Sequence, residues 1–301
     1  MKALMCVPNI SEGTDISIVE KVVDSIRSAP GVMLLDYSSN SDHNRSVITY
    51  IGQPEPVVEA TKHLTKTALE LIDMTRQKGM HPRQGAVDVV PFIPIRGISE
   101  EDAVSIARDF GRYVGEELDV PVYFYEDAAT RPERQSLAKV RKGQYEALAE
   151  KLKDLEWAPD EGPCRFVPRS GSVQVSSRFP LVAFNINLAT TDLDIAQSIA
   201  KSVRFINGGF RYVRAIGLSL KEAGMVQVSM NLTHYEKTPI PMVVEAVKRE
   251  AARYGVSVAG TELVGPVPLG AMGQVLRYYL QTHDFSMDQI IENALIGWTG
   301  E

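Results

Sequence analysis

The feature that most constrains the fold is an order of predicted elements that occurs twice along the chain. Continuous or alternating apolar runs predict the strands, and apolar residues spaced three to four apart predict the helices. Each half reads strand, helix, strand, strand, helix, strand, which is the split unit of ferredoxin-like domains. The first set covers residues 2–7, 15–29, 32–36, 46–51, 54–74 and 87–95, and the second covers 181–188, 192–206, 212–218, 226–232, 239–254 and 256–264.

The duplication predicts an α/β (α+β) protein with two ferredoxin-like βαββαβ subdomains side by side and a ligand cleft between them. We place the first subdomain at residues 1–175 and the second at 176–301. A single continuous α/β sheet is the alternative, and the direct strand-to-strand steps disfavour it. Four further segments have their own predictions: a helix and strand at 100–125, a charged helix at 139–155, irregular chain at 158–171 and terminal helices at 266–298.

Composition and charge exclude several classes of function. The net charge of −6 leaves no basic excess for general nucleic-acid binding. The two cysteines, Cys6 and Cys164, are too few for a disulfide scaffold or a zinc cage. There is no signal peptide at the start and no apolar run of 18 residues, so we expect a cytoplasmic protein without a membrane span.

The segment from His81 to Pro94 joins a constrained turn to a buried strand. Pro82 fixes its own φ and favours an extended His81, and Gly85 allows a close backbone approach. An imidazole beside the permanent charge of Arg83, anchored on a strand, suits proton transfer on an anionic substrate. A surface turn carrying an ordinary histidine and arginine fits the local pattern equally well.

Other side chains have weaker patterns. Cys164 could be a nucleophile with His81 as its base, although a small half-buried residue is the simpler interpretation. Asn185 and Asn187 share one face of a strand, where they either bond to a neighbouring loop or recognise a ligand. No histidine pair has the spacing of a metal site, so we predict no metal.

Several segments, in order over essentially the whole chain, resemble the glutamate formiminotransferase family. They are Val7-Pro8-Asn9-Ile10-Ser11-Glu12-Gly13, Asn44-Arg45-Ser46-Val47, His81 to Pro94, Arg134-Gln135-Ser136-Leu137, Trp157-Ala158-Pro159-Asp160, Phe184-Asn185-Ile186-Asn187-Leu188 and Leu263-Val264-Gly265-Pro266-Val267-Pro268-Leu269. Each segment alone is a weak signal, whereas the ordered set is specific. Because the chain ends at Glu301, it resembles the stand-alone transferase rather than the animal enzymes that continue into a cyclodeaminase.

The resemblance implies a cytoplasmic homodimeric transferase of histidine degradation and one-carbon metabolism. Such an enzyme moves the formimino group from N-formimino-L-glutamate to N5 of tetrahydrofolate, a co-substrate, without a metal. Formyl transfer from N-formylglutamate is an alternative, as is a folate-binding protein without catalysis. An intact His81 disfavours the latter.

The resemblance also implies the site residues. His81 matches the family's catalytic histidine, and the segment from Gly162 to Gly171 matches its folate-contacting loop. The arginines are candidate clamps for substrate carboxylates. The candidate substrate- and folate-binding residues are Asn9, Arg45, Arg83, Gly162, Pro163, Cys164, Arg165, Phe166, Val167, Pro168, Arg169, Ser170, Gly171, Asn185 and Asn187. Where animal members have an acidic residue, this chain has Ser38, so Asp42 or another carboxylate would have to act as the acidic partner of His81.

Overall fold

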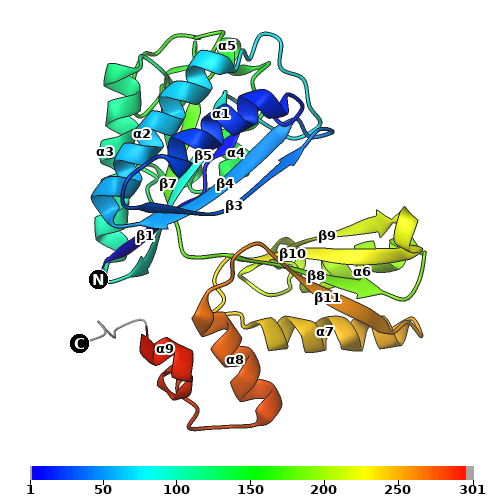
Figure 1. Ribbon diagram of the computed structural model, residues 1–301. Coiled ribbons are helices and arrows are strands. Elements are labelled where there is room, and N and C mark those ends of the chain that lie inside the picture. The colour runs from blue at the N-terminus through cyan, green and yellow to red at the C-terminus, as the bar shows by residue number, and fades with distance from the viewer. Residues whose placement is uncertain (1, 296–301) are drawn as a thin grey trace. The chain divides into compact units, whose positions relative to one another are not determined.

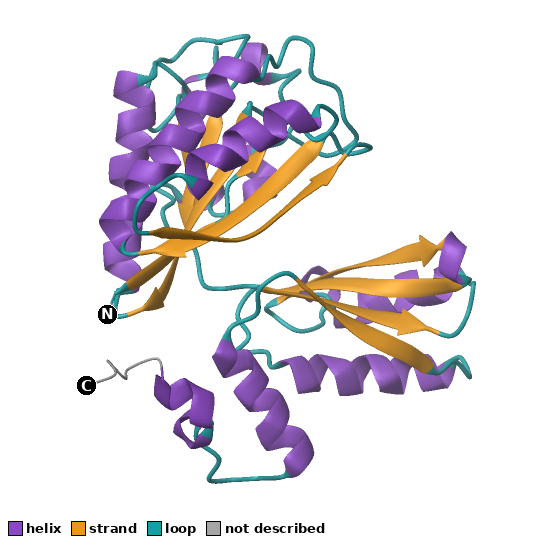
Figure 2. Ribbon diagram, in the orientation of Figure 1, coloured by secondary structure: helices purple, strands orange, loops and turns teal. Residues whose placement is uncertain are grey.

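A computed structural model describes residues 2–295 and divides the chain into two compact units, Met1–Arg178 and Phe179–Glu301. Each unit has its own sheet, with helices packed on it (Figures 1 and 2). The predicted mixture of α and β structure in two separate sheets is confirmed.

The sheet of the first unit has seven strands in the described chain. They are β1 (Ala3–Cys6), β2 (Asn9–Ile10), β3 (Val32–Asn40), β4 (Arg45–Gly52), β5 (Val87–Arg96), β6 (Val122–Glu126) and β7 (Val173–Ser177). From β3, the order runs through β4 to β1 and β2, which share one position, and then to β5, β7 and β6. The pairings from β3 to β5 are antiparallel, and the last two are parallel.

Helices cover both faces of this sheet. α1 (Ile16–Arg27), α2 (Pro54–Leu71) and α3 (Glu100–Glu117) bury their apolar stripes on one face, as Figure 1 shows. On the other face a smaller cluster joins Tyr123 and Tyr125 to the short helices α4 (Leu137–Val140) and α5 (Leu148–Lys151). The caps follow the sequence, since Asp15 accepts from the Ser17 amide and Ser99 forms a capping box with Asp102.

The second unit has the strands β8 (Val182–Leu188), β9 (Val213–Leu220), β10 (Met225–Leu232) and β11 (Val258–Val264), in the order β11-β8-β10-β9. The helices α6 (Leu193–Val203), α7 (Ile240–Arg253) and α8 (Leu269–Leu280) contribute to its core, and α9 (Ile291–Leu295) follows. In both units the fourth strand of the repeat lies beside the first, and the third separates the first from the second.

The structure differs from the predicted elements in four places. The range 139–155 is not one helix, because Gly143 and Gln144 have φ of 84° and 57° and separate α4 from α5. The strand β7 was not predicted, because Gln174, Ser176 and Ser177 interrupt its apolar pattern. The predicted loop at 8–14 contains β2, and β3 extends to Asn40. Trp298, where the predicted terminal helices end, lies outside the described residues.

No helix within residues 2–295 is both long and apolar enough to cross a membrane.

Candidate functional site

The segment that carries His81 is fixed within the first unit by hydrogen bonds to Ser11 and by a close approach to Ser172. The Ser11 hydroxyl donates to the Gly85 carbonyl at 2.7 Å, and the Ser11 amide donates to the Ala86 carbonyl at 2.8 Å. Gly85 lies so close to Ser172 that a Cβ there would approach the Ser172 carbonyl oxygen to 2.2 Å. Only glycine permits this approach, so the turn predicted from Pro82 and Gly85 holds His81 against the sheet.

The imidazole of His81 is half-buried, and its Nδ1 lies 2.8 Å from the carbonyl oxygen of Pro82. Because a carbonyl only accepts, Nδ1 carries the proton and Nε2 has a free lone pair. Burial is the largest cause that lowers the pKa of His81 from 6.5 to about 4, and the positive charge of Arg45 is the next. His81 is therefore a neutral imidazole at pH 7, which can accept a proton at Nε2.

A buried carboxylate, Asp88, contributes to the charge around this imidazole. The pairing of β2 with β5 skips one residue, because Asn9 is opposite Val89 and Ile10 is opposite Val87. Asp88 is the extra residue of this β-bulge, and bulges commonly redirect a side chain. Val87 and Val90 accordingly pack in the main core, whereas Val89 packs in the cluster on the opposite face.

Asp88 binds two arginines through one oxygen. Its Oδ2 lies 2.6 Å from Nη1 of Arg45 and 2.7 Å from Nη1 of Arg141, and its Oδ1 accepts from the Gln84 amide at 2.8 Å. Nε and Nη2 of Arg45 donate to Oδ1 of Asn9 at 3.0 and 2.7 Å. Two guanidinium groups thus share one carboxylate, and a net positive charge remains beside His81.

Arg141 also reaches the loop of His81, because its Nη1 donates to the Pro82 carbonyl at 2.9 Å. No carboxylate bonds to His81 in the part of the chain that the structure describes; its polar partner is the Pro82 carbonyl. Asp42, which the sequence suggested as the acidic partner, forms no bond to His81 in the described chain. Asp88 is linked to the loop of His81 through Arg141, which bonds to both Asp88 and the Pro82 carbonyl.

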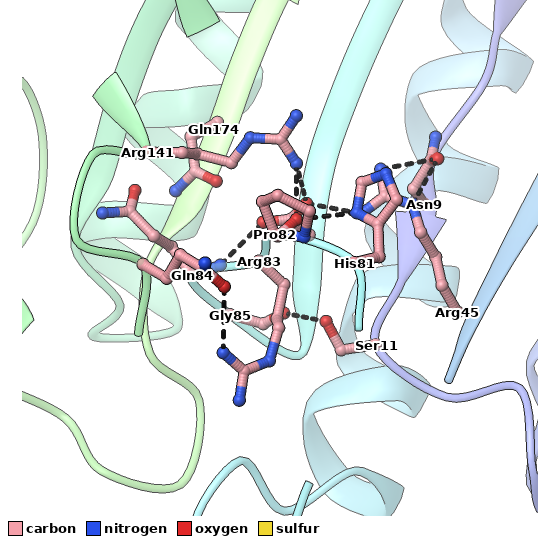
Figure 3. Close-up of polar contacts among 12 residues, drawn as sticks. Asn9, Ser11, Arg45, His81, Pro82, Arg83, Gln84, Gly85, Arg141 and Gln174 are labelled. Carbon is pink, nitrogen blue, oxygen red and sulfur yellow. Dashed lines mark hydrogen bonds and ion pairs between the residues drawn. The ribbon is translucent and has the colours of Figure 1, made fainter. Parts of the chain in front are cut away.

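Arg83 has different surroundings from Arg45. Its side chain is 6% exposed, forms two bonds to Glu146 at 2.9 and 2.7 Å, and donates to Gln77 at 2.7 Å. Figure 3 shows it running away from His81, while Asn9 and Arg45 lie beside the imidazole. Of the predicted residues, the structure thus brings Asn9 and Arg45 to His81 and gives Arg83 structural partners.

The predicted folate-contacting loop, Gly162 to Gly171, is irregular and is attached at its end to the His81 segment. The Ala86 amide donates to the Ser170 carbonyl at 2.8 Å, and the Ser172 amide donates to the Gln84 carbonyl at 3.1 Å. Tyr145 supports the middle of the loop, since its hydroxyl donates to the Pro168 carbonyl at 2.7 Å and its ring lies 5.5 Å from that of Phe166.

The charged side chains of this loop lie at the surface. Arg165 pairs with Asp119, and Arg169 donates to the Glu70 carbonyl at 2.6 Å. Sγ of Cys164 lies 3.7 Å from the Leu152 carbonyl, and within residues 2–295 no contact joins Cys164 to His81. The described residues include no group of histidine, cysteine or acidic side chains that could hold a metal ion.

Asn185 and Asn187 lie on one face of β8, as predicted, and bond to neighbouring strands rather than to a loop. Their side-chain amides donate to Glu262 at 3.4 and 3.0 Å, and Gln227 donates to Oδ1 of Asn187 at 2.8 Å. Their role as folate contacts stays a prediction.

Sequence reasoning missed Asp88 and Arg141. Asp88 had a signal, because a carboxylate within the apolar run from Val87 to Ile93 needs a cation when it is buried. Arg141 had none, since it lies in a stretch that contains several lysines and arginines.

Comparison with known proteins gives matches over both units. Residues 3–178 match the N-terminal subdomain of the formiminotransferase domain, and residues 183–297 match the formiminotransferase domain. Glutamate formimidoyltransferase of Streptococcus pyogenes serotype M1 is 48% identical over 297 residues, covering 98% of this chain and 99% of that protein. The glutamate formimidoyltransferase of Thermoplasma acidophilum is 44% identical over 297 residues, covering 98% of each chain. Formimidoyltransferase-cyclodeaminase of Mus musculus is 45% identical over 280 residues, covering 91% of this chain and 52% of that protein.

Proposed function

The chain belongs to the formiminotransferase family, and we propose that it is a glutamate formimidoyltransferase. In this proposal it moves the formimino group of N-formimino-L-glutamate to N5 of tetrahydrofolate, which is a co-substrate. The observation that carries the proposal is His81 itself, with a free Nε2 lone pair beside two arginines that share one carboxylate.

The reaction requires one proton to move between two nitrogens. N5 of tetrahydrofolate attacks the carbon of the formimino group and forms a tetrahedral intermediate. N5 then loses its proton, and the glutamate nitrogen gains one as the old carbon–nitrogen bond breaks. Nε2 of His81 accepts the first proton and returns it to the glutamate nitrogen. General acid–base catalysis of this kind contributes about 10²- to 10⁴-fold in rate.

The charges beside His81 suit an anionic donor. The carboxylates of formiminoglutamate only accept hydrogen bonds, and guanidinium groups only donate them. Within the described residues Arg141 makes its contacts through Nη1, so Nε and Nη2 remain as donors. We therefore assign Arg141 to the carboxylates of formiminoglutamate, with the positive charge of Arg45 beside it, and Arg83 to the support of the loop through Glu146.

We assign the loop from Gly162 to Gly171 to tetrahydrofolate. The main chain at the end of this loop bonds to Gln84 and Ala86. These bonds support the assignment, because a molecule bound along the loop would lie close to the segment that carries His81. Holding both substrates in one fixed geometry supplies much of the remaining acceleration. We further propose that the protein is cytoplasmic and forms a homodimer. Light scattering of the purified protein tests the homodimer.

The test is glutamate release from the purified protein with tetrahydrofolate and either N-formimino-L-glutamate or N-formyl-L-glutamate. The proposal requires that glutamate is released from the formimino donor and that this release depends on tetrahydrofolate. Glutamate release from the formyl donor alone would instead support formyl transfer. His81→Ala should lower turnover by about 10²- to 10⁴-fold while the protein stays folded. His63→Ala is the matched control, because His63 is an exposed histidine on α2. Near-normal turnover of folded His81→Ala would remove His81 from the mechanism.

A further inference from the structure

The carbonyl of Pro82 accepts two hydrogen bonds. Nδ1 of His81 lies 2.8 Å from its oxygen and Nη1 of Arg141 lies 2.9 Å from the same atom. A carbonyl oxygen has two lone pairs, so both bonds can form at once. The direction of the imidazole therefore depends on where this carbonyl is held.

Arg141 is itself held in place. The same Nη1 donates to Oδ2 of Asp88 at 2.7 Å, and the other oxygen of Asp88 accepts from the Gln84 amide. Asp88 is fully buried on the bulge of β5, so neither its position nor its direction depends on the solvent. The contacts form one continuous series from Asp88 through Arg141 and Pro82 to His81.

We propose that Arg141 and Asp88 are positioning residues, which set the direction and the tautomer of His81 through the carbonyl of Pro82. The inference rests on the proposed function, in which His81 is the base. Whichever ring nitrogen is bonded decides which one carries the proton, and groups that orient a functional histidine from behind commonly decide its efficiency. Here the orienting atom is a backbone carbonyl, where other enzymes use a carboxylate.

Four charged or titratable groups face His81, from three elements and one loop. They are Arg45 on β4, Asp88 on β5, Arg141 at the end of α4, and His43 between β3 and β4, whose ring lies 5.7 Å from that of His81. Replacing Arg141 by an uncharged residue removes one of the two cations and should raise the pKa of His81 from about 4 toward its ordinary value.

Three substitutions separate the contacts of Arg141. Arg141→Lys keeps a charged donor, and one nitrogen already makes both contacts in the parent protein. Arg141→Gln keeps a donor without charge, and Arg141→Met keeps neither. We expect turnover to fall in the order Lys, Gln, Met, with about a 10- to 100-fold loss for Met. Because Arg141 is also assigned to the carboxylates of formiminoglutamate, turnover alone does not test the positioning role. Lys142→Met is the matched control, since Lys142 is an exposed cation next in the chain.

The deciding measurement is nitrogen NMR of the His81 side chain, followed against pH. The parent and Lys142→Met should show the Nδ1-protonated form and the low pKa. Folded Arg141→Met should show a mixture of tautomers and a raised pKa. If folded Arg141→Met keeps the parental tautomer and titration, the inference is overturned, whatever happens to turnover. Absence of formimino transfer by the parent would refute the proposed function instead, and the NMR result would still decide whether Arg141 orients His81.

Discussion

Replacing Gly171 by alanine should detach the 162–171 loop from the His81 segment. Gly171 has a φ of 68°, which L-residues rarely adopt, and a Cβ there would lie 2.0 Å from the Gln84 carbonyl oxygen and 2.8 Å from Cα of Gly85. These neighbours are backbone atoms, so no side-chain rotation can relieve the contact.

The magnitude has two parts. The left-handed conformation alone costs about 1–2 kcal/mol for an alanine. Moving the loop away also breaks the bonds from Ser172 to Gln84 and from Ala86 to Ser170. At about 0.5–1.5 kcal/mol each, these add about 1–3 kcal/mol.

Gly31→Ala is the control that isolates the second part. Gly31 lies in the same unit with a φ of 73°, but its Cβ would meet only the ring of Pro56, at 3.1 and 3.3 Å. A stability loss of 1 kcal/mol lowers Tm by about 2–4 °C in a domain of 150–250 residues. In calorimetry the first unit of Gly171→Ala should therefore melt about 2–12 °C below that of Gly31→Ala. Equal melting temperatures for the two variants would refute the close docking of the loop.

Three further predictions concern acid stability, metals and the arginines of the loop. His81 has a pKa of about 4 in the folded protein against 6.5 in the unfolded chain. Its contribution to the free energy of unfolding is therefore fully present above pH 6.5 and is lost as the pH falls to 4. The Tm of the parent should decline more steeply over that range than the Tm of His81→Gln; a shallower decline would show that His81 is not buried as a neutral group. Transfer activity should survive dialysis against a chelator. Activity that is lost on dialysis and returns on adding zinc would reveal a metal site. Arg165→Ala and Arg169→Ala should raise the KM for tetrahydrofolate without changing that for formiminoglutamate; unchanged values in both variants would contradict the assignment of the loop.

Much of the fold could be predicted because the apolar periodicity of the repeat is clear. The first helix begins after its capping residue, Asp15, the second begins at Pro54, and the strands that follow are apolar. The strand β7 escaped prediction for a physical reason. Its side chains Gln174 and Ser176 are buried polar groups, and the strand lies between β5 and β6, with which it pairs only in the folded protein.

The candidate site was predicted only in part, because it depends on contacts between distant positions. His81 and Arg45 were found from local motifs and the family resemblance, which is confirmed. The contact of Arg141 with Asp88 joins residues 53 apart in the chain, and no local pattern of the sequence encodes it. The sequence also does not distinguish the surroundings of Arg45 from those of Arg83. Only the packed structure shows that Arg83 pairs with Glu146.

The bulge in β5 makes the length of this strand more important to the site than the identity of the apolar residues around Asp88. Side chains alternate between the faces of a strand, so deleting one residue between Val87 and Val89 would restore regular pairing with β2 and leave no acidic side chain beside the two arginines. Substituting an apolar neighbour would only change the packing. Relatives that keep this chemistry should therefore tolerate other apolar residues in place of Val87, Val89 and Val90, but no insertion or deletion there. An alignment of active relatives can be read for that spacing, even where the surrounding residues differ.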